Sequence, residues 1–145
     1  MTNAASFYSG NDMHVTGNSY GIVNNQNDCN EFGDYNTYSA EIDAQAQTMT
    51  DLLHVFAAGN SGGQTCSPYS GGKRTVFDGP QTAKNSITVG ALDKNLANNR
   101  SGFSSQGPTD DGRLKPEISA IGNAISTGKN DPVIQVHVLI ITIIP

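Results

Sequence analysis

The chain has 145 residues, a length that fits one domain or a piece of one and is sufficient to bury a core. Apolar residues make up 36% of the sequence and recur in runs throughout, so the composition excludes an intrinsically disordered chain. The formal net charge is −5 and the eight Lys and Arg are scattered, so no basic patch predicts a nucleic-acid partner.

The N-terminal part of the chain is polar and contains one predicted strand. Residues 1–10 have neither a charged n-region nor an apolar h-region, so no signal peptide is predicted. Residues 13–19 are expected to form a strand that ends at Tyr20-Gly21. The loop of residues 22–36 carries several acidic side chains, but their spacing does not fit an EF-hand, and no metal site is predicted there.

Residues 38–53 form the clearest predicted helix. Apolar side chains recur there at steps of three or four and make one stripe: Tyr38, Ile42, Ala46, Met49 and Leu53. Thr37 is the predicted N-cap, and Glu41 is expected in the first turn, where a negative charge is favourable. This helix leads directly into the next predicted element.

Residues 52–62, LLHVFAAGNSG, read as a buried strand that ends abruptly in a tight loop. With a further strand at residues 86–91, the order of elements predicts an α/β fold with a parallel sheet. The turn would hold the Asn60 amide at the carboxyl end of its strand, where such sheets bind ligands and where an amide can stabilise an oxyanion. The alternative is a loop asparagine that satisfies its own turn.

The two cysteines, Cys29 and Cys66, both lie in loops rich in Asn and Gly. They do not form a CxxC pair, so neither a metal site nor a redox motif is predicted. The sequence leaves open whether they form one disulfide or remain two thiols, because only the fold sets the distance between them.

Several motifs follow one another in a familiar order. They are VTGNSYG at 15–21, AAGNSG at 57–62, SITVGALD at 86–93, SGFSSQGP at 101–108 and GRLKPEISAIG at 112–122. Together they resemble the middle of a subtilisin-like serine protease, over most of residues 13–127. The resemblance implies a partial subtilisin-like α/β fold, in which a mostly parallel sheet is flanked by helices and followed by an irregular C-terminal tail.

The resemblance also implies roles for individual residues. Asn60 would be the side-chain donor of the oxyanion hole, and the turn at 103–108 would have a structural role. The remaining candidates would bind a polypeptide substrate: Ser19, Tyr20 and Gly21 as an extended edge, and Ala57, Ala58 and Gly59 as a wall of the specificity pocket. No cofactor is predicted and no residue is assigned to a metal, while the sequence leaves calcium sites open. The family implies a secreted or extracytoplasmic location.

The Asp, His and Ser of the catalytic triad are not found in their family settings. The motifs of the Asp and the His are expected before residue 13, and nothing there matches. None of His14, His54 and His137 lies in the family's histidine setting, so none is predicted as the general base. We therefore expect the isolated chain not to cleave peptides, since an oxyanion hole without a nucleophile gives little catalysis.

The sequence divides into a partial peptidase domain, residues 1–131, and an anomalous apolar tail, residues 132–145. The tail is uncharged and β-branched, lacks the family's serine motif, and has an apolar run too short for a membrane span, which takes roughly 20 residues. We interpret it as a frameshift or truncation scar. The flanking elements that such a fragment lacks would leave apolar faces exposed, so poor solubility is expected.

Two other functions fit part of the sequence. A non-catalytic pseudoprotease or peptide-binding module would keep all the motifs above and genuinely lack the triad. A phosphate-binding loop at AAGNSGG is disfavoured, because no P-loop lysine follows at the required spacing and no GxGxxG is present.

Overall fold

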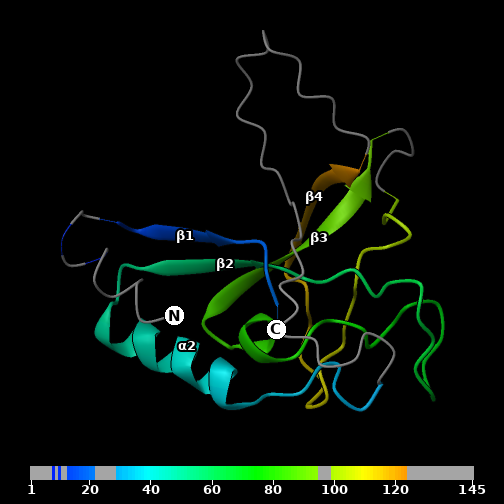
Figure 1. Cartoon of the computed structure of the whole chain (residues 1–145), viewed down its shortest axis with the longest axis horizontal. Helices are drawn as coiled ribbons and strands as arrows, with labels where there is room; N and C mark the ends of the chain where they lie inside the picture. The colour runs from blue at the N-terminus through cyan, green and yellow to red at the C-terminus, as the bar shows by residue number, and fades with distance from the viewer. Residues whose placement is uncertain (1–7, 9, 11–12, 22–28, 95–98, 124–145) are drawn as a thin grey trace, which may run out of the picture.

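A computed structural model describes residues 8, 10, 13–21, 29–94 and 99–123 of the chain. Within this part, four strands form one sheet (Figure 1): β1 (Val15–Asn18), β2 (Leu53–Ala57), β3 (Ser86–Asp93) and β4 (Ile118–Asn123). Their spatial order is β1-β2-β3-β4, and each neighbouring pair is parallel. The predicted α/β class with a parallel sheet is therefore confirmed.

Strand β4 is the one strand of this sheet that the sequence did not predict. It lies within the GRLKPEISAIG motif, and its register places Val89 of β3 opposite Ile118. The register shifts between Leu92 and Asp93, where β3 and β4 become irregular. The apolar alternation of this strand is short and ends at a glycine, which explains why its pattern alone did not indicate a strand.

The helix α2 (Thr37–Thr48) follows the prediction in position but differs from it at both ends. The predicted cap at Thr37 is wrong: the Asn36 side chain accepts hydrogen bonds from the backbone of Tyr38 and Ser39, and Thr37 is the first helical residue. Glu41 consequently lies beyond the first turn, which contains no acidic residue. The predicted end at Leu53 is also wrong, since that residue opens β2.

The apolar stripe predicted for this helix is only partly buried. Ile42 and Met49 are buried, but Tyr38 is 42% exposed. Two polar residues take buried places instead. The Ser39 hydroxyl donates to the carbonyl of Gly79 in the 3₁₀ helix η1 (Gly79–Thr82), and Asp43 accepts from backbone N–H groups at the start of β3. Polar contacts therefore fix α2 to its neighbours.

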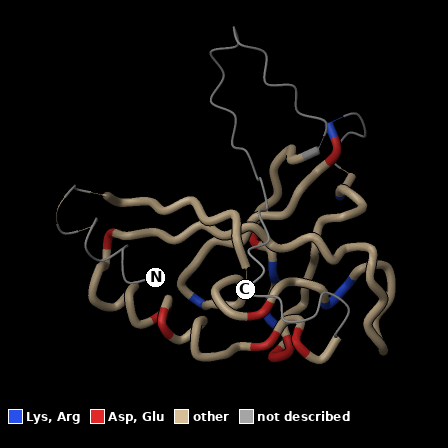
Figure 2. The backbone as a smooth tube through the Cα atoms, viewed as in Figure 1, with Lys and Arg blue, Asp and Glu red and all other residues tan. Residues whose placement is uncertain are grey.

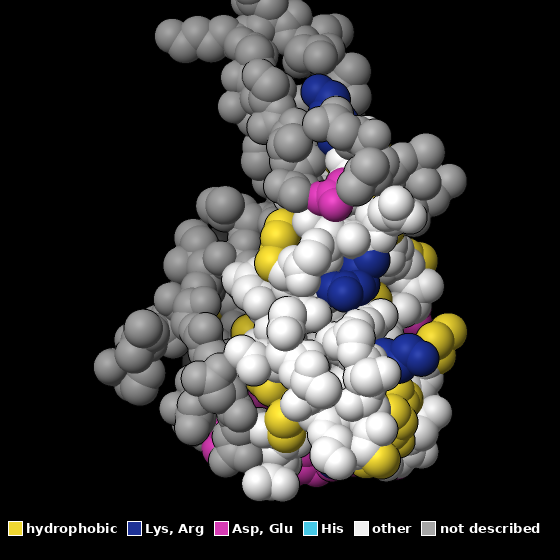
Figure 3. Space-filling model, turned by 90° about the vertical axis from the view of Figure 1, so that its right-hand side faces the viewer, with side chains coloured by type: hydrophobic (Ala, Val, Ile, Leu, Met, Phe, Trp, Pro, Cys, Tyr) yellow, Lys and Arg dark blue, Asp and Glu magenta, His cyan; other side chains and the backbone are white. Residues whose placement is uncertain are grey.

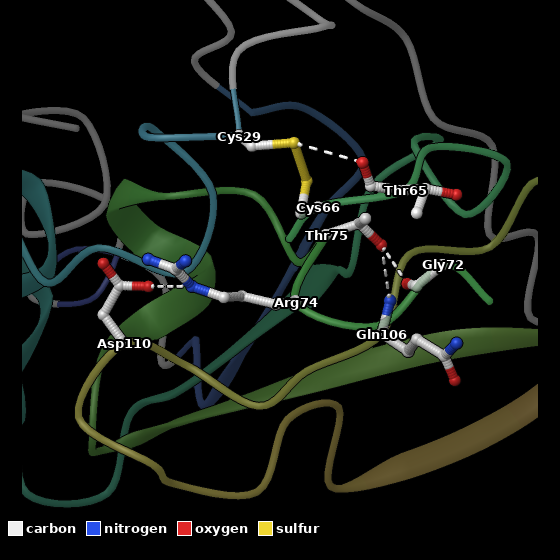
Figure 4. Close-up of a disulfide and its surroundings, with 8 residues drawn as sticks. All are labelled: Cys29, Thr65, Cys66, Gly72, Arg74, Thr75, Gln106 and Asp110. Carbon is white, nitrogen blue, oxygen red and sulfur yellow. Dashed lines mark hydrogen bonds and ion pairs between the residues drawn. A yellow bond between two sulfur atoms is a disulfide. The ribbon is translucent and has the colours of Figure 1, made fainter. Parts of the chain in front are cut away.

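Two apolar clusters form the core. Ile42 of α2, Phe56 of β2 and Ala83 pack between the helix and one face of the sheet. The second cluster contains Phe32, Cys66 and Phe77, with Cys29 packed against it, and lies among the loops. Cys29 and Cys66 are joined by a disulfide (Figure 4), with their Cα atoms 5.3 Å apart, so the structure resolves the alternative that the sequence left open.

The face of the sheet opposite α2 is apolar and partly uncovered. Since side chains alternate along a strand, the register places Val15, Leu53 and Ile118 on this face. These side chains are 58%, 36% and 52% exposed, respectively. Parallel sheets are almost always covered on both faces, so this face is shaped to receive a further layer.

Candidate functional site

The loop after β2 is built around a conformation that favours glycine. At the end of the strand, the Ala58 N–H donates to the Val89 carbonyl, and the Ala58 carbonyl accepts from the Phe77 N–H, each at 3.0 Å. Gly59 then has φ +119°, and a Cβ there would lie only 2.4 Å from Cδ1 of Phe77. The chain therefore turns sharply away from the sheet at this residue, and Asn60, which follows, is exposed.

Ser105 holds the backbone on both sides of Asn60. Its N–H donates to the Gly59 carbonyl at 3.0 Å, and its hydroxyl accepts from the Ser61 N–H at 2.9 Å. Ser105 itself is 1% exposed, so these bonds are shielded from water. These bonds fix the backbone on both sides of Asn60, just beyond the carboxyl end of β2.

The rest of the FSSQGP turn links this loop to β3. The Ser104 hydroxyl accepts from the Ala91 N–H at 2.8 Å, and the Gln106 carbonyl accepts from the N–H groups of Thr75 and Val76. The turn is thus a bridge between the sheet and the loop that carries Asn60. These contacts give it the structural role that the sequence indicated.

The segment Ser19–Gly21 continues from β1 and is held by η1. The Gln81 side chain donates to the Tyr20 carbonyl at 2.7 Å. The Tyr20 ring packs edge-on against Phe56, at 6.1 Å between centroids, and its burial raises the pKa of the phenol. The side chain of Tyr20 therefore contributes to the core, and any substrate-binding role of this segment falls to its backbone and to Ser19.

The loop between Gly59 and η1 is anchored at several points. Figure 4 shows the disulfide at Cys66 and three further contacts at Arg74 and Thr75. The Thr75 hydroxyl donates to the Gly72 carbonyl and accepts from the Gln106 N–H, and Arg74 pairs with Asp110 at 2.7 Å. These contacts hold the loop in a fixed conformation beside Asn60.

Asp78 places a carboxyl group at the end of this loop, and the sequence did not indicate a special role for this residue. Burial, followed by the nearby carboxylates of Glu31 and Asp34, raises the pKa of Asp78 to about 6. The Asn36 side chain donates to its carboxylate at 2.9 Å. Figure 2 shows acidic residues gathered along α2 and the loops at the lower margin of the view.

The described histidines lie far from Asn60. His54 is 3% exposed, its Nδ1 lies 2.7 Å from the Thr16 hydroxyl, and burial lowers the pKa of its ring. Its position near the start of β2 places it about 10 Å along the strand from Ala57, the last residue of β2, with the Asn60 loop beyond. His14 precedes β1 and pairs with Asp51 at 3.2 Å. The remaining candidate, His137, lies outside the described residues.

A pocket of about 530 Å³ lies beside the FSSQGP turn. Its thirteen lining residues include Gly90, Ser104, Ser105, Leu114 and Ser119, but neither Asn60 nor any residue of the Ser19–Gly21 segment. Ser105, which holds the loop of Asn60, therefore also lines this pocket. On the face of the molecule shown in Figure 3, Lys and Arg side chains form separate patches among neutral ones.

Within the described ranges, no group of three or more His, Cys, Asp or Glu is arranged to hold a metal ion. The same part of the chain contains no helix with the length and apolarity needed to cross a bilayer.

The model of the family described as the Subtilase family matches residues 1–139. The matched region contains all the motifs quoted above and runs beyond residue 131, into the predicted apolar tail. The family supports serine-type peptidase function in general, and its members are generally extracellular.

Proposed function

The chain belongs to the subtilase family, and on that premise we propose that it carries the oxyanion-stabilising and peptide-binding part of a serine endopeptidase site. The observation that supports this most directly is the pair of hydrogen bonds from Ser105 to the backbone on either side of Asn60. A donor for an oxyanion must be positioned before charge develops, and this arrangement fixes the loop without using the carboxamide itself.

In this proposal, an extended peptide pairs with the backbone of Ser19–Gly21, next to the edge strand β1. Ala57, Ala58 and Gly59 form one wall of the slot for a substrate side chain, since their small size leaves space beside the peptide. The scissile carbonyl oxygen then points to the Asn60 amide. When a nucleophile attacks the carbonyl carbon, the oxygen gains negative charge and the hydrogen bond from the amide strengthens.

We further propose that the chain does not hydrolyse peptides by itself. Of the two described histidines, neither lies at the Asn60 end of the sheet, so neither is in reach of a nucleophile there as a general base. A purified sample should release no fluorophore from labelled casein beyond the buffer rate. Turnover that a serine-protease inhibitor abolishes would contradict this part of the proposal.

Peptide binding tests the part of the proposal that concerns this chain. A casein-derived decapeptide should shift the NMR signals of the Gly21 amide and of the Asn60 side-chain NH₂ group. Asn60→Ala should leave the Gly21 shifts in place, because the peptide pairs with the edge through its backbone. A peptide that perturbs neither group would contradict the assignment of the site.

The alternative function is a peptide-binding module without catalytic activity, and the position of the described histidines favours it. The sequence of the encoding locus distinguishes the two functions, because aspartate and histidine motifs of the subtilase type upstream would indicate an enzyme. In such a longer protein, Asn60→Ala should lower kcat by about 10² to 10³ with little change in KM, a magnitude that comes from subtilisin itself. Unchanged kcat in that protein would contradict the role of Asn60.

We also infer that the protein acts outside the cytoplasm. The disulfide between Cys29 and Cys66 supports this location, because disulfides persist mainly in oxidising compartments. Cell fractionation with an antibody against the chain tests it, and recovery from the cytosol with both thiols reduced would contradict it.

A further inference from the structure

We propose that Phe77 is a positioning residue that sets the spacing between the peptide-binding edge at Gly21 and the loop that presents Asn60. The functional meaning of this spacing rests on the function proposed above. The geometry itself comes from residues that lie far apart in the sequence and meet at one aromatic ring.

The two segments contact opposite edges of the Phe77 ring. A Cβ at Gly21 would lie 2.6 Å from Cδ2, whereas a Cβ at Gly59 would lie 2.4 Å from Cδ1. The two δ carbons are on opposite sides of a phenyl ring. The backbones of the two segments are therefore held apart by the width of this ring, and neither segment has space for a side chain.

The ring cannot move easily away from this position. Phe77 is 2% exposed and stacks on Phe32, with 6.2 Å between ring centroids and 11° between ring planes. It belongs to the cluster that contains Cys66, which the disulfide ties to Cys29. Its own N–H donates to the Ala58 carbonyl, so its backbone is fixed to the end of β2 as well.

A rigid spacer at this place has a consequence for the site. A peptide paired with the Ser19–Gly21 backbone has its carbonyl groups fixed relative to that edge. The distance from such a carbonyl to the Asn60 amide then depends on the separation of the two segments. Because misplacement by about 1 Å can cost on the order of 10²-fold in rate, a ring of fixed width is a means to keep that separation constant.

The test asks whether a change at Gly21 reaches Asn60 through Phe77. Gly21 has no positive φ, and the three atoms nearest to the methyl group added in Gly21→Ala belong to the side chains of Phe77 and Gln81. We expect G21A to shift the backbone amide signals of Gly59 and Asn60 in ¹⁵N-labelled chain without any peptide. Gly17→Ala is the matched control, since it lies in β1 with nothing within 4 Å of an added Cβ, and it should leave those signals unchanged.

A second set of variants removes the Phe77 ring. Phe77→Val lacks both δ carbons, so adding G21A to F77V should no longer shift the Gly59 and Asn60 signals. Phe77→Ile, which retains more of the buried volume but has only one δ carbon, serves the same purpose if circular dichroism shows that F77V is unfolded. Signals that do not move in G21A, or that still move in the F77V or F77I background, would overturn the proposal.

Peptide affinity separates a positioning role from plain packing. Titration with the casein-derived decapeptide should show at least about fivefold weaker binding for folded F77I than for the unaltered chain, and no change for G17A. Unchanged affinity in F77I would reduce Phe77 to a packing residue and overturn its positioning role. Failure of the unaltered chain to bind the peptide would instead contradict the proposed function, while the signal shifts in G21A would still report on the spacer.

Discussion

Replacing Asp78 with Asn should stabilise the chain at neutral pH. Burial and two neighbouring carboxylates raise the pKa of Asp78 from its ordinary value of 3.8 to about 6. A raised pKa means that the folded state favours the protonated carboxyl, so this group contributes stability below about pH 4 and that contribution is lost as the pH rises through 6. The Asn side chain stays neutral throughout and can still accept the hydrogen bond from Asn36.

The size of the effect follows from the rise in pKa. A rise of about two pH units corresponds to at most about 3 kcal/mol, because each unit is worth about 1.4 kcal/mol. Asp78 is half-buried, and solvent screening reduces the effect, so we expect D78N to gain about 1 to 2 kcal/mol at pH 8. At pH 4 and below, the variant and the unaltered chain should have nearly equal stabilities.

Urea unfolding followed by far-UV circular dichroism at several pH values between 4 and 8 measures this difference. The two proteins are compared at the same pH, because His54 has a lowered pKa and loses stability in the opposite direction, as the pH falls below its unfolded value of 6.5. Glu41→Gln, which changes an exposed carboxylate on α2, is the control. A difference between D78N and the unaltered chain that is the same at pH 4 and pH 8 would refute the reasoning.

Three further changes test the framework around Asn60. Gly59→Ala should lower the free energy of unfolding in urea by at least about 2 kcal/mol, because the added Cβ clashes with the buried Phe77 ring and the φ of this residue is unfavourable for alanine. Gly63→Ala is the control, since a Cβ at Gly63 has open space around it. Equal losses in the two variants would contradict the argument. Ser105→Ala leaves the buried Ser61 N–H without its acceptor, so we expect a loss of about 1 to 3 kcal/mol and faster hydrogen exchange at that amide, and unchanged exchange would be inconsistent with the bond. Reducing the disulfide should lower stability by about 2 to 4 kcal/mol and lower the thermal midpoint; a midpoint insensitive to dithiothreitol would show that the link is not formed in solution.

The central strand and its loop could be predicted because their signals are local. An apolar run followed by Gly59 and Asn60 indicates a buried strand and a turn with few alternatives, and the structure has both. The end of the helix was ambiguous, because Leu52 and Leu53 continue its apolar pattern while also opening the next strand. Its start was ambiguous because Asn36 and Thr37 are adjacent and both are good capping residues.

Features that depend on distant contacts could not be predicted from the pattern. Ser39 and Asp43 are buried because their partners at η1 and the start of β3 lie about 40 residues away in the chain. Asp78 acquires its raised pKa from burial, and then from carboxylates, and both depend on the fold. The pairing of the two cysteines and the meeting of Gly21 with Gly59 at one ring have the same origin.

The uncovered apolar face of the sheet determines how the isolated chain behaves in solution. Val15, Leu53 and Ile118 form an apolar surface that is exposed to solvent. A second molecule of the same chain can bury this surface. Oligomers formed in this way would bind the dye ANS less strongly than the monomer. Ile118→Lys would convert these oligomers to monomers. The association state of the purified chain therefore reports whether this face of the sheet is covered in solution.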